Sequence, residues 1–181
     1  ELPAGARVVL YNAENPSEAY GPFTALPAGG ETLWTPTCFS ERIAVECVVP
    51  PGVEVGQVRI EVAQSTYRYV PVARSLLDKA TGACNLDVSC YEDWAETALG
   101  VGGLGTVTQD GELLCTFALV SDNDPCSDAD YVLTARHCFG GAGVPSADSA
   151  EFYWFYQTQV CDGLPPASPT DVPRTTGGAV L

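Results

Sequence analysis

The sequence lacks methionine, long apolar runs and an abundance of basic residues. Its 181 residues begin at Glu1 and contain no Met, so we expect a preceding segment, with a secretory signal peptide as one candidate. No apolar run approaches the roughly 18 residues of a membrane-spanning helix, which predicts no membrane contact of that kind. Only 8 Lys and Arg residues face 23 Asp and Glu residues. Nucleic-acid binding needs a basic surface, so no nucleic-acid partner is expected.

The acidic charge is concentrated in the second part of the chain. Residues 1–79 carry a net charge of −3, and residues 80–181 carry −12. A field of this sign attracts cationic partners or substrates. It also keeps a secreted protein soluble, and the sequence leaves both interpretations open.

Eight cysteines form no C-x-x-C pair, and the chain has a single histidine. A zinc site usually requires close Cys or Cys/His pairs, so we expect no metal site of this type. Disulfides are the better interpretation, and they predict an oxidising compartment. The cysteines are Cys38, Cys47, Cys84, Cys90, Cys115, Cys126, Cys138 and Cys161.

Residues 1–72 show the two-residue alternation of half-buried β-strands. Ile43, Val45, Cys47 and Val49 would share one face of a strand, and 58–62 repeats the pattern. These patterns predict a small β-sandwich over 1–72. Cys38 and Cys47 flank a predicted turn, and a disulfide between them would close it.

Residues 73–83 have the composition of a linker and include Lys79, the only lysine of the chain. An exposed lysine between two domains is a favourable place for proteolysis. Beyond the linker we expect a short helix at 91–99 and strands at 112–120, 131–134 and 150–158.

The stretch from Gly100 to Gly105 matches the pattern G-x-G-x-x-G. A dinucleotide-binding fingerprint needs a strand before it and a helix after it. Here a possible helix precedes and a strand-like segment follows, so the stretch is interpreted as a flexible loop without a nucleotide.

Residues 121–130 contain four aspartates, and calcium favours such oxygen ligands. Their spacing fits no EF-hand loop, so we expect a solvated loop and no cofactor. A calcium site is the weaker alternative, with candidate ligands Asp122, Asp124, Asp128 and Asp130.

The single histidine lies at the end of the segment Y-V-L-T-A-R-H-C, residues 131–138. This segment resembles the histidine motif of trypsin- and chymotrypsin-like serine proteases. The resemblance implies that His137 is the general base and that Cys138 bonds Cys115. Phe117 and Ala118 depart from the small residues usual in the strand after the upstream cysteine.

Three further motifs are similar to those of the bacterial lysyl endopeptidase branch of that family. They are C-N-L-D-V-S-C at 84–90, the cysteine at 115, and Y-W-F-Y-Q-T-Q-V-C at 153–161, where Phe155 replaces the usual Asn. The resemblance implies a Cys90–Cys161 disulfide. Cys84 would pair with a cysteine outside these residues, or with Cys126, which has no counterpart in the family pattern.

The resemblance also implies a fold and a processing site. Residues 84–181 would form most of the first β-barrel of a two-barrel chymotrypsin-like protease, which makes the whole chain all-β. Members of this branch are cut after a lysine shortly before the first mature cysteine. We therefore predict cleavage between Lys79 and Ala80, with 1–79 as a pro-region.

The predicted function is that of a secreted serine endopeptidase precursor, extracellular or periplasmic in transit, cleaving polypeptides after Lys or Arg. No serine lies in a G-[DS]-S-G context, and Asp171 is not followed by an apolar strand. The triad Asp and Ser are therefore expected beyond Leu181, in the C-terminal half of the same protease, which is the expected partner. The alternative is a non-catalytic, protease-like binding or inhibitor module.

Overall fold

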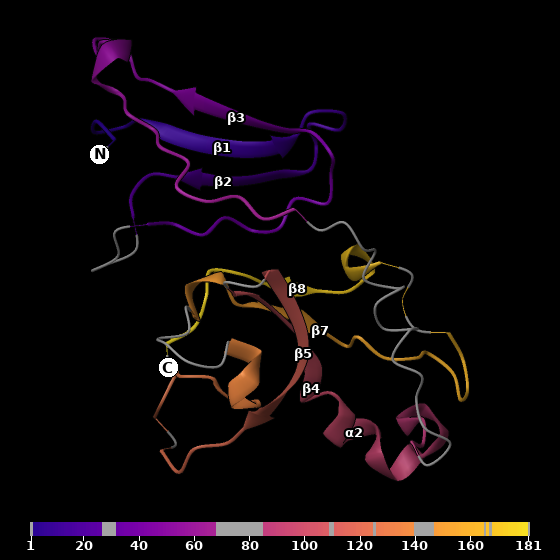
Figure 1. Ribbon diagram of the computed structural model, residues 1–181. Helices are drawn as coiled ribbons and strands as arrows, with labels where there is room; N and C mark the ends of the chain where they lie inside the picture. The colour runs from indigo at the N-terminus through magenta and orange to yellow at the C-terminus, as the bar shows by residue number, and fades with distance from the viewer. Residues whose placement is uncertain are drawn as a thin grey trace. The chain divides into compact units, whose positions relative to one another are not determined.

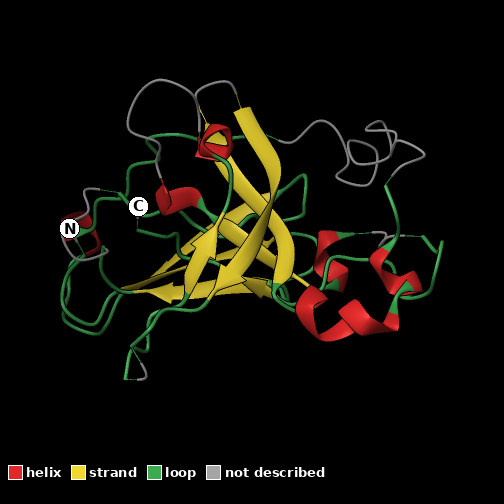
Figure 2. Ribbon diagram, turned by 90° about the horizontal axis from the view of Figure 1, so that it is seen from below, coloured by secondary structure: helices red, strands yellow, loops and turns green. Residues whose placement is uncertain are grey.

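The chain divides into two compact units, residues 1–65 and 66–181. The computed structural model describes residues 2–26, 32–67, 85–108, 111–124, 126–139, 147–164, 166 and 168–180. Strands make up most of the regular structure, and the helical segments are short (Figures 1 and 2). The predicted all-β class is confirmed. The linker 73–83, with Lys79, Ala80 and the adjoining Cys84, lies outside the described residues.

The first unit contains one antiparallel sheet with the order β2-β1-β3. Its strands are β1 (Arg7–Asn12), β2 (Ala19–Phe23) and β3 (Ile43–Val48). Strand β3 forms where the alternation of apolar residues predicted it, and it pairs with β1 through Val45 opposite Leu10 and Cys47 opposite Val8. This face of the sheet therefore collects the alternating apolar side chains of both strands.

The second strand predicted in this unit, at 58–62, does not form. A short 3-10 helix, η1 (Val55–Gln57), precedes this segment, and Ile60 and Val62 remain 46% and 72% exposed. Alternation of apolar residues identifies a segment that could form a strand. The strand forms only if a neighbouring strand exchanges backbone hydrogen bonds with it. Within 2–26 and 32–67, the expected sandwich is represented by a single three-stranded layer.

The second unit contains a five-stranded antiparallel sheet with the order β6-β5-β4-β7-β8. The sheet is open in the described residues, as expected for part of a barrel. Its strands are β4 (Val101–Thr108), β5 (Gly111–Val120), β6 (Tyr131–Leu133), β7 (Glu151–Trp154) and β8 (Arg174–Thr175).

Short helical segments surround this sheet and include the helix predicted at 91–99. The predicted helix forms as η3 (Glu92–Trp94) followed by α2 (Ala95–Ala98), which leads directly into β4 (Figure 1). The remaining segments are η2 (Val88–Cys90), η4 (Arg136–Phe139), η5 (Ala147–Ser149) and η6 (Pro169–Asp171).

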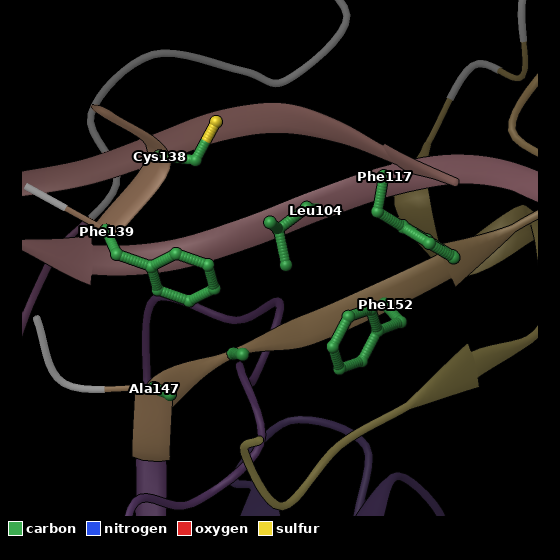
Figure 3. Close-up of a cluster of buried hydrophobic side chains, with 7 residues drawn as sticks. Leu104, Phe117, Cys138, Phe139, Ala147 and Phe152 are labelled. Carbon is green, nitrogen blue, oxygen red and sulfur yellow. The ribbon is translucent and has the colours of Figure 1, made fainter. Parts of the chain in front are cut away.

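The core of the second unit packs against the inner face of β4, β5 and β7. Phe117 of β5 contacts the edges of two rings of β7, with centroids 5.1 Å from Phe152 and 4.9 Å from Trp154. Edge-to-face pairs of this kind add about 0.5–1.5 kcal/mol each to the burial of the rings. The cluster comprises Leu104, Phe117, Cys138, Phe139, Ala147, Ala150 and Phe152 (Figure 3).

The glycine-rich stretch is not a flexible loop, because residues 101–105 form the first part of β4 and only Gly100 precedes it, so this interpretation of the sequence was wrong. A Cβ on Gly102 would lie 2.6 Å from Cε1 of Phe117 and 2.6 Å from the carbonyl oxygen of Tyr153. The strand therefore needs glycine because the neighbouring strands carry a large ring and a closely approaching backbone. The pattern serves sheet packing and not the binding of a phosphate.

We expect Gly102→Ala to lower the free energy of unfolding by about 1–3 kcal/mol, because the added methyl must displace the Phe117 ring or the β7 backbone. Urea denaturation measures the change. The matched control is Gly103→Ala on the same strand, where the nearest atom to the new Cβ is at an ordinary 3.5 Å. Equal losses in the two variants would contradict this account of β4.

No helix among the described residues has both the length and the apolar character to cross a membrane.

Candidate active site around His137

His137 lies in a short turn that follows β6, an edge strand of the five-stranded sheet. Strand β6 pairs with β5 through Tyr131 opposite Val120 and Leu133 opposite Ala118. The chain then leaves the sheet and enters the turn η4, where the amide of Cys138 donates to the carbonyl of Ala135 at 2.9 Å. Cys138 is buried and His137 is exposed. The turn therefore anchors itself with the residue after the histidine and presents the imidazole to solvent.

A disulfide joins this turn to β5. Cys115 and Cys138 are bonded with their Cα atoms 6.0 Å apart, and 23 residues separate them in sequence. A loop of this length corresponds to a stabilisation of about 3 kcal/mol by restriction of the unfolded chain. A ring nitrogen of His137 lies within 4.8 Å of both sulfur atoms. The structure thus contains the first of the two disulfides that the family resemblance implied.

Two threonine hydroxyls hold the same turn, and sequence reasoning did not find their role. Thr134 Oγ1 donates to the carbonyl of Thr116 in β5 at 2.7 Å, just before the turn begins. Thr106 Oγ1, from β4, donates to the carbonyl of Cys138. Thr134 was visible within the T-A-R-H-C motif, whereas nothing in the sequence connects Thr106 with a residue 32 positions later.

His137 has no catalytic partner among the described residues: it forms no ion pair and accepts or donates no hydrogen bond there. Asp171 is engaged elsewhere, because its carboxylate accepts the amide of Ser168 at 2.9 Å in a capping box at the start of η6. The described part of the chain therefore presents an accessible imidazole. A nucleophile and an orienting carboxylate would have to come from other residues.

The second implied disulfide joins the segment before the five-stranded sheet to the segment after β7. Cys90, at the end of η2, is bonded to Cys161, which follows β7, across 71 residues. Beside it lies the half-buried carboxylate of Asp87, the aspartate of the C-N-L-D-V-S-C motif. This carboxylate accepts the amide and the hydroxyl of Ser89, at 3.0 and 2.9 Å. It also accepts the hydroxyl of Thr158 at 2.7 Å and the amide of Asp162 at 2.9 Å.

These hydrogen bonds, first among them that from Thr158, lower the pKa of the Asp87 carboxyl below its ordinary value, because they favour the charged form. Asp87 thus caps η2 and ties two segments that lie about 70 residues apart. The sequence motif contained this aspartate, but its spacing alone did not indicate four donors converging on one carboxylate.

We expect Asp87→Asn to lower the free energy of unfolding at neutral pH, because a neutral amide is a weaker acceptor than a carboxylate. A lowered folded-state pKa makes the contribution of the carboxylate fully present above the pKa of the unfolded chain, about 3.9. That contribution is then lost as the pH falls through the lower folded value. In urea titrations, the difference between wild type and variant should therefore shrink from about pH 6 to about pH 2.5.

Asp93→Asn, at an exposed position in η3, is the control for this measurement. A difference from wild type that did not shrink on acidification for Asp87→Asn, or that shrank equally for Asp93→Asn, would count against the role assigned to Asp87.

The predicted Cys38–Cys47 disulfide is not formed, so that prediction was wrong. The segment that carries Cys38 does not fold back as a strand beside β3, whose described partner is β1. Cys47 lies instead on an extended strand, opposite Val8 of β1. Cys126 is an exposed free thiol.

The described residues offer no ready set of metal ligands. Their two groups of neighbouring Cys, His and Asp side chains each contain a bonded cysteine pair, which has no thiolate to give. In the loop 121–130, Asp122 accepts the amide of Asp124 at 3.1 Å and Asp124 accepts that of Cys126 at 3.0 Å. These aspartates organise turns, and the structure does not gather the four of them into one group.

Two comparisons with known proteins both find similarity to lysyl endopeptidases. The family model described as "Lysyl endopeptidase, C-terminal domain" matches residues 79–181. The lysyl endopeptidase of Pseudomonas aeruginosa is 27% identical over 161 residues, which cover 81% of this chain and 33% of that protein. The chain thus spans about a third of the length of this relative. The matched 81% exceeds the share that residues 79–181 represent, so the similarity extends into 1–78. No solved structure matches the chain significantly.

Proposed function

The chain belongs to the lysyl endopeptidase family, and we propose that it is the N-terminal portion of a secreted serine endopeptidase precursor with His137 as its general base. The observation that carries the proposal is that the imidazole of His137 is exposed while the next residue, Cys138, is buried and bonded to Cys115. A general base must reach the substrate and keep its direction, and this turn provides both.

In the proposed mechanism, His137 takes the proton of a serine hydroxyl as that oxygen attacks the peptide carbonyl. It then gives the proton to the departing amine. A buried aspartate holds the second ring nitrogen, and backbone amides near the serine stabilise the oxyanion. The aspartate and serine are assigned to the part of the protease outside these 181 residues.

The course of residues 176–180 supports this assignment. The amide of Ala179 donates to the carbonyl of Ala147 at 2.9 Å, and its side chain packs against the cluster that contains Cys138 and Phe139. The segment after β8 therefore returns to the core that carries the histidine turn.

The proposed substrate is a polypeptide cleaved after Lys or Arg. The description of the matched family and relative supports the preference for lysine. The net charge of −12 on residues 80–181 suits a basic substrate, because an acidic surface raises the local concentration of cations. The disulfides support secretion, since such bonds persist in oxidising compartments.

In the full-length protease, His137→Ala should lower kcat on the order of 10⁶-fold, because it removes the group that takes the serine proton. Initial rates on paired Lys and Arg peptides measure both this loss and the specificity. Arg136→Gln, at the exposed preceding position, is the control and should retain most of the activity.

Retention of full activity by His137→Ala would refute the proposed role. A full-length wild-type protein that binds polypeptides without hydrolysing them would instead favour the non-catalytic binding module.

Processing between Lys79 and Ala80 is the second part of the proposal. The segment matched by the family model begins at residue 79, which supports a boundary there. N-terminal sequencing of the active enzyme should therefore read Ala-Thr-Gly-Ala-Cys. Lys79→Ala should leave 1–79 attached, whereas Arg74→Ala should not. A mature enzyme that starts at another residue would contradict the proposed site.

A further inference from the structure

Thr106 is a polar side chain in the apolar core of the second unit. It lies on β4, the central strand of the five-stranded sheet, and only 1% of its surface is exposed. Leu104, two residues earlier on the same face, is equally buried in the hydrophobic cluster. A hydroxyl in such surroundings is unfavourable unless it finds a hydrogen-bond partner. Valine would have almost the same shape and would avoid this cost.

The partner of this hydroxyl belongs to the histidine turn. Thr106 Oγ1 donates to the carbonyl of Cys138, the residue that follows His137. The disulfide and the Thr134 hydrogen bond both attach the turn to β5. Cys138 and Phe139 also pack in the same cluster as Leu104 of β4, but such apolar contacts are non-directional. The hydrogen bond from Thr106 adds a directional contact from β4 and so opposes rotation of the turn about β5.

We infer that Thr106 is a positioning residue for His137: its hydroxyl fixes the carbonyl of Cys138 and thereby the direction of the imidazole. This rests on the proposed function, in which His137 is the general base. A displacement of about 1 Å in a reacting group can reduce a rate on the order of 100-fold. A buried hydroxyl that prevents such a displacement would therefore contribute to kcat and not only to folding.

The competing explanation is that the hydroxyl only satisfies a buried carbonyl. The experiment must separate this effect on stability from an effect on the histidine. Thr106→Val keeps the shape of the side chain and removes the donor, whereas Thr106→Ser keeps the donor. The matched control is Ser149→Ala, because Ser149 is also buried and its hydroxyl accepts the amide of Val107, the next residue of β4, at 3.0 Å.

The single histidine makes the readout unambiguous, because the imidazole signals in NMR spectra of the 181-residue chain all come from His137. We expect Thr106→Val to shift and broaden the two ring C–H signals as the ring samples several directions. Thr106→Ser and Ser149→Ala should leave these signals at their wild-type positions, although Ser149→Ala lowers stability. In the full-length protease, Thr106→Val should reduce kcat about 10- to 100-fold with little change in KM, and Thr106→Ser should restore it.

Unchanged His137 signals and kcat in folded Thr106→Val would overturn the inference, as would equal changes in Ser149→Ala. Should Thr106→Val fail to fold, Thr106→Ala takes its place, and the same outcomes apply. The result is separable from that for the proposed function. If His137→Ala were active while Thr106→Val moved the ring signals, the proposed function would fail and the positioning contact would stand. If His137→Ala were inactive and Thr106→Val left the signals unchanged, the proposed function would stand and the positioning contact would fail.

Discussion

The bond between Cys115 and Cys138 is the constraint on which the site depends. It brings a turn that would otherwise leave the sheet at its edge into contact with the core, where Cys138 joins Phe117 and Leu104. Because adjacent residues in such a turn point in different directions, burial of Cys138 leaves His137 in solvent. Two adjacent residues therefore have different roles: Cys138 anchors the turn, and His137 presents its imidazole to solvent. Without the anchor, a four-residue turn has too few internal hydrogen bonds to hold a side chain in one direction.

The core beneath the turn depends on an unusual pairing of glycine with aromatic rings. Gly102 leaves space that Phe117 fills, and Phe117 contacts Phe152 and Trp154 of the next strand but one. This packing draws β5, β4 and β7 together on one face. The turn with His137 and the segment around Ala179 both lie against this core. The histidine turn and the segment around Ala179 thus share one core.

A second disulfide and the carboxylate of Asp87 hold another part of the second unit together. Asp87 accepts hydrogen bonds from Ser89, Thr158 and the amide of Asp162, next to the Cys90–Cys161 bond. A charged acceptor with several donors is a stronger fastening than a neutral hydrogen bond. The segment between β7 and β8 is thereby joined to the residues before β4, about 70 positions earlier in the sequence.

Local sequence patterns were sufficient to predict the features that depend on residues close together along the chain. The strands at 112–120 and 131–134, the short helix near Trp94, and the segment leading to His137 follow from alternation, β-branched and aromatic residues, and a motif with a specific spacing. The pairing of Cys115 with Cys138 came from family resemblance and not from spacing alone. Cys38 and Cys47 illustrate the difference, because a turn between two cysteines suggested a bond that the structure does not contain.

The tertiary structure decided every feature that depends on which strands become neighbours. Gly102 was misinterpreted as part of a loop because the ring of Phe117 lies beside it only after β4 and β5 pair. Val58 to Val62 alternate like a strand, yet no strand among the described residues pairs with them. Thr106 and Asp87 find their partners 32 and about 70 residues away. Hydrogen bonds and side-chain packing act over a few ångströms in space, and a sequence records only distance along the chain.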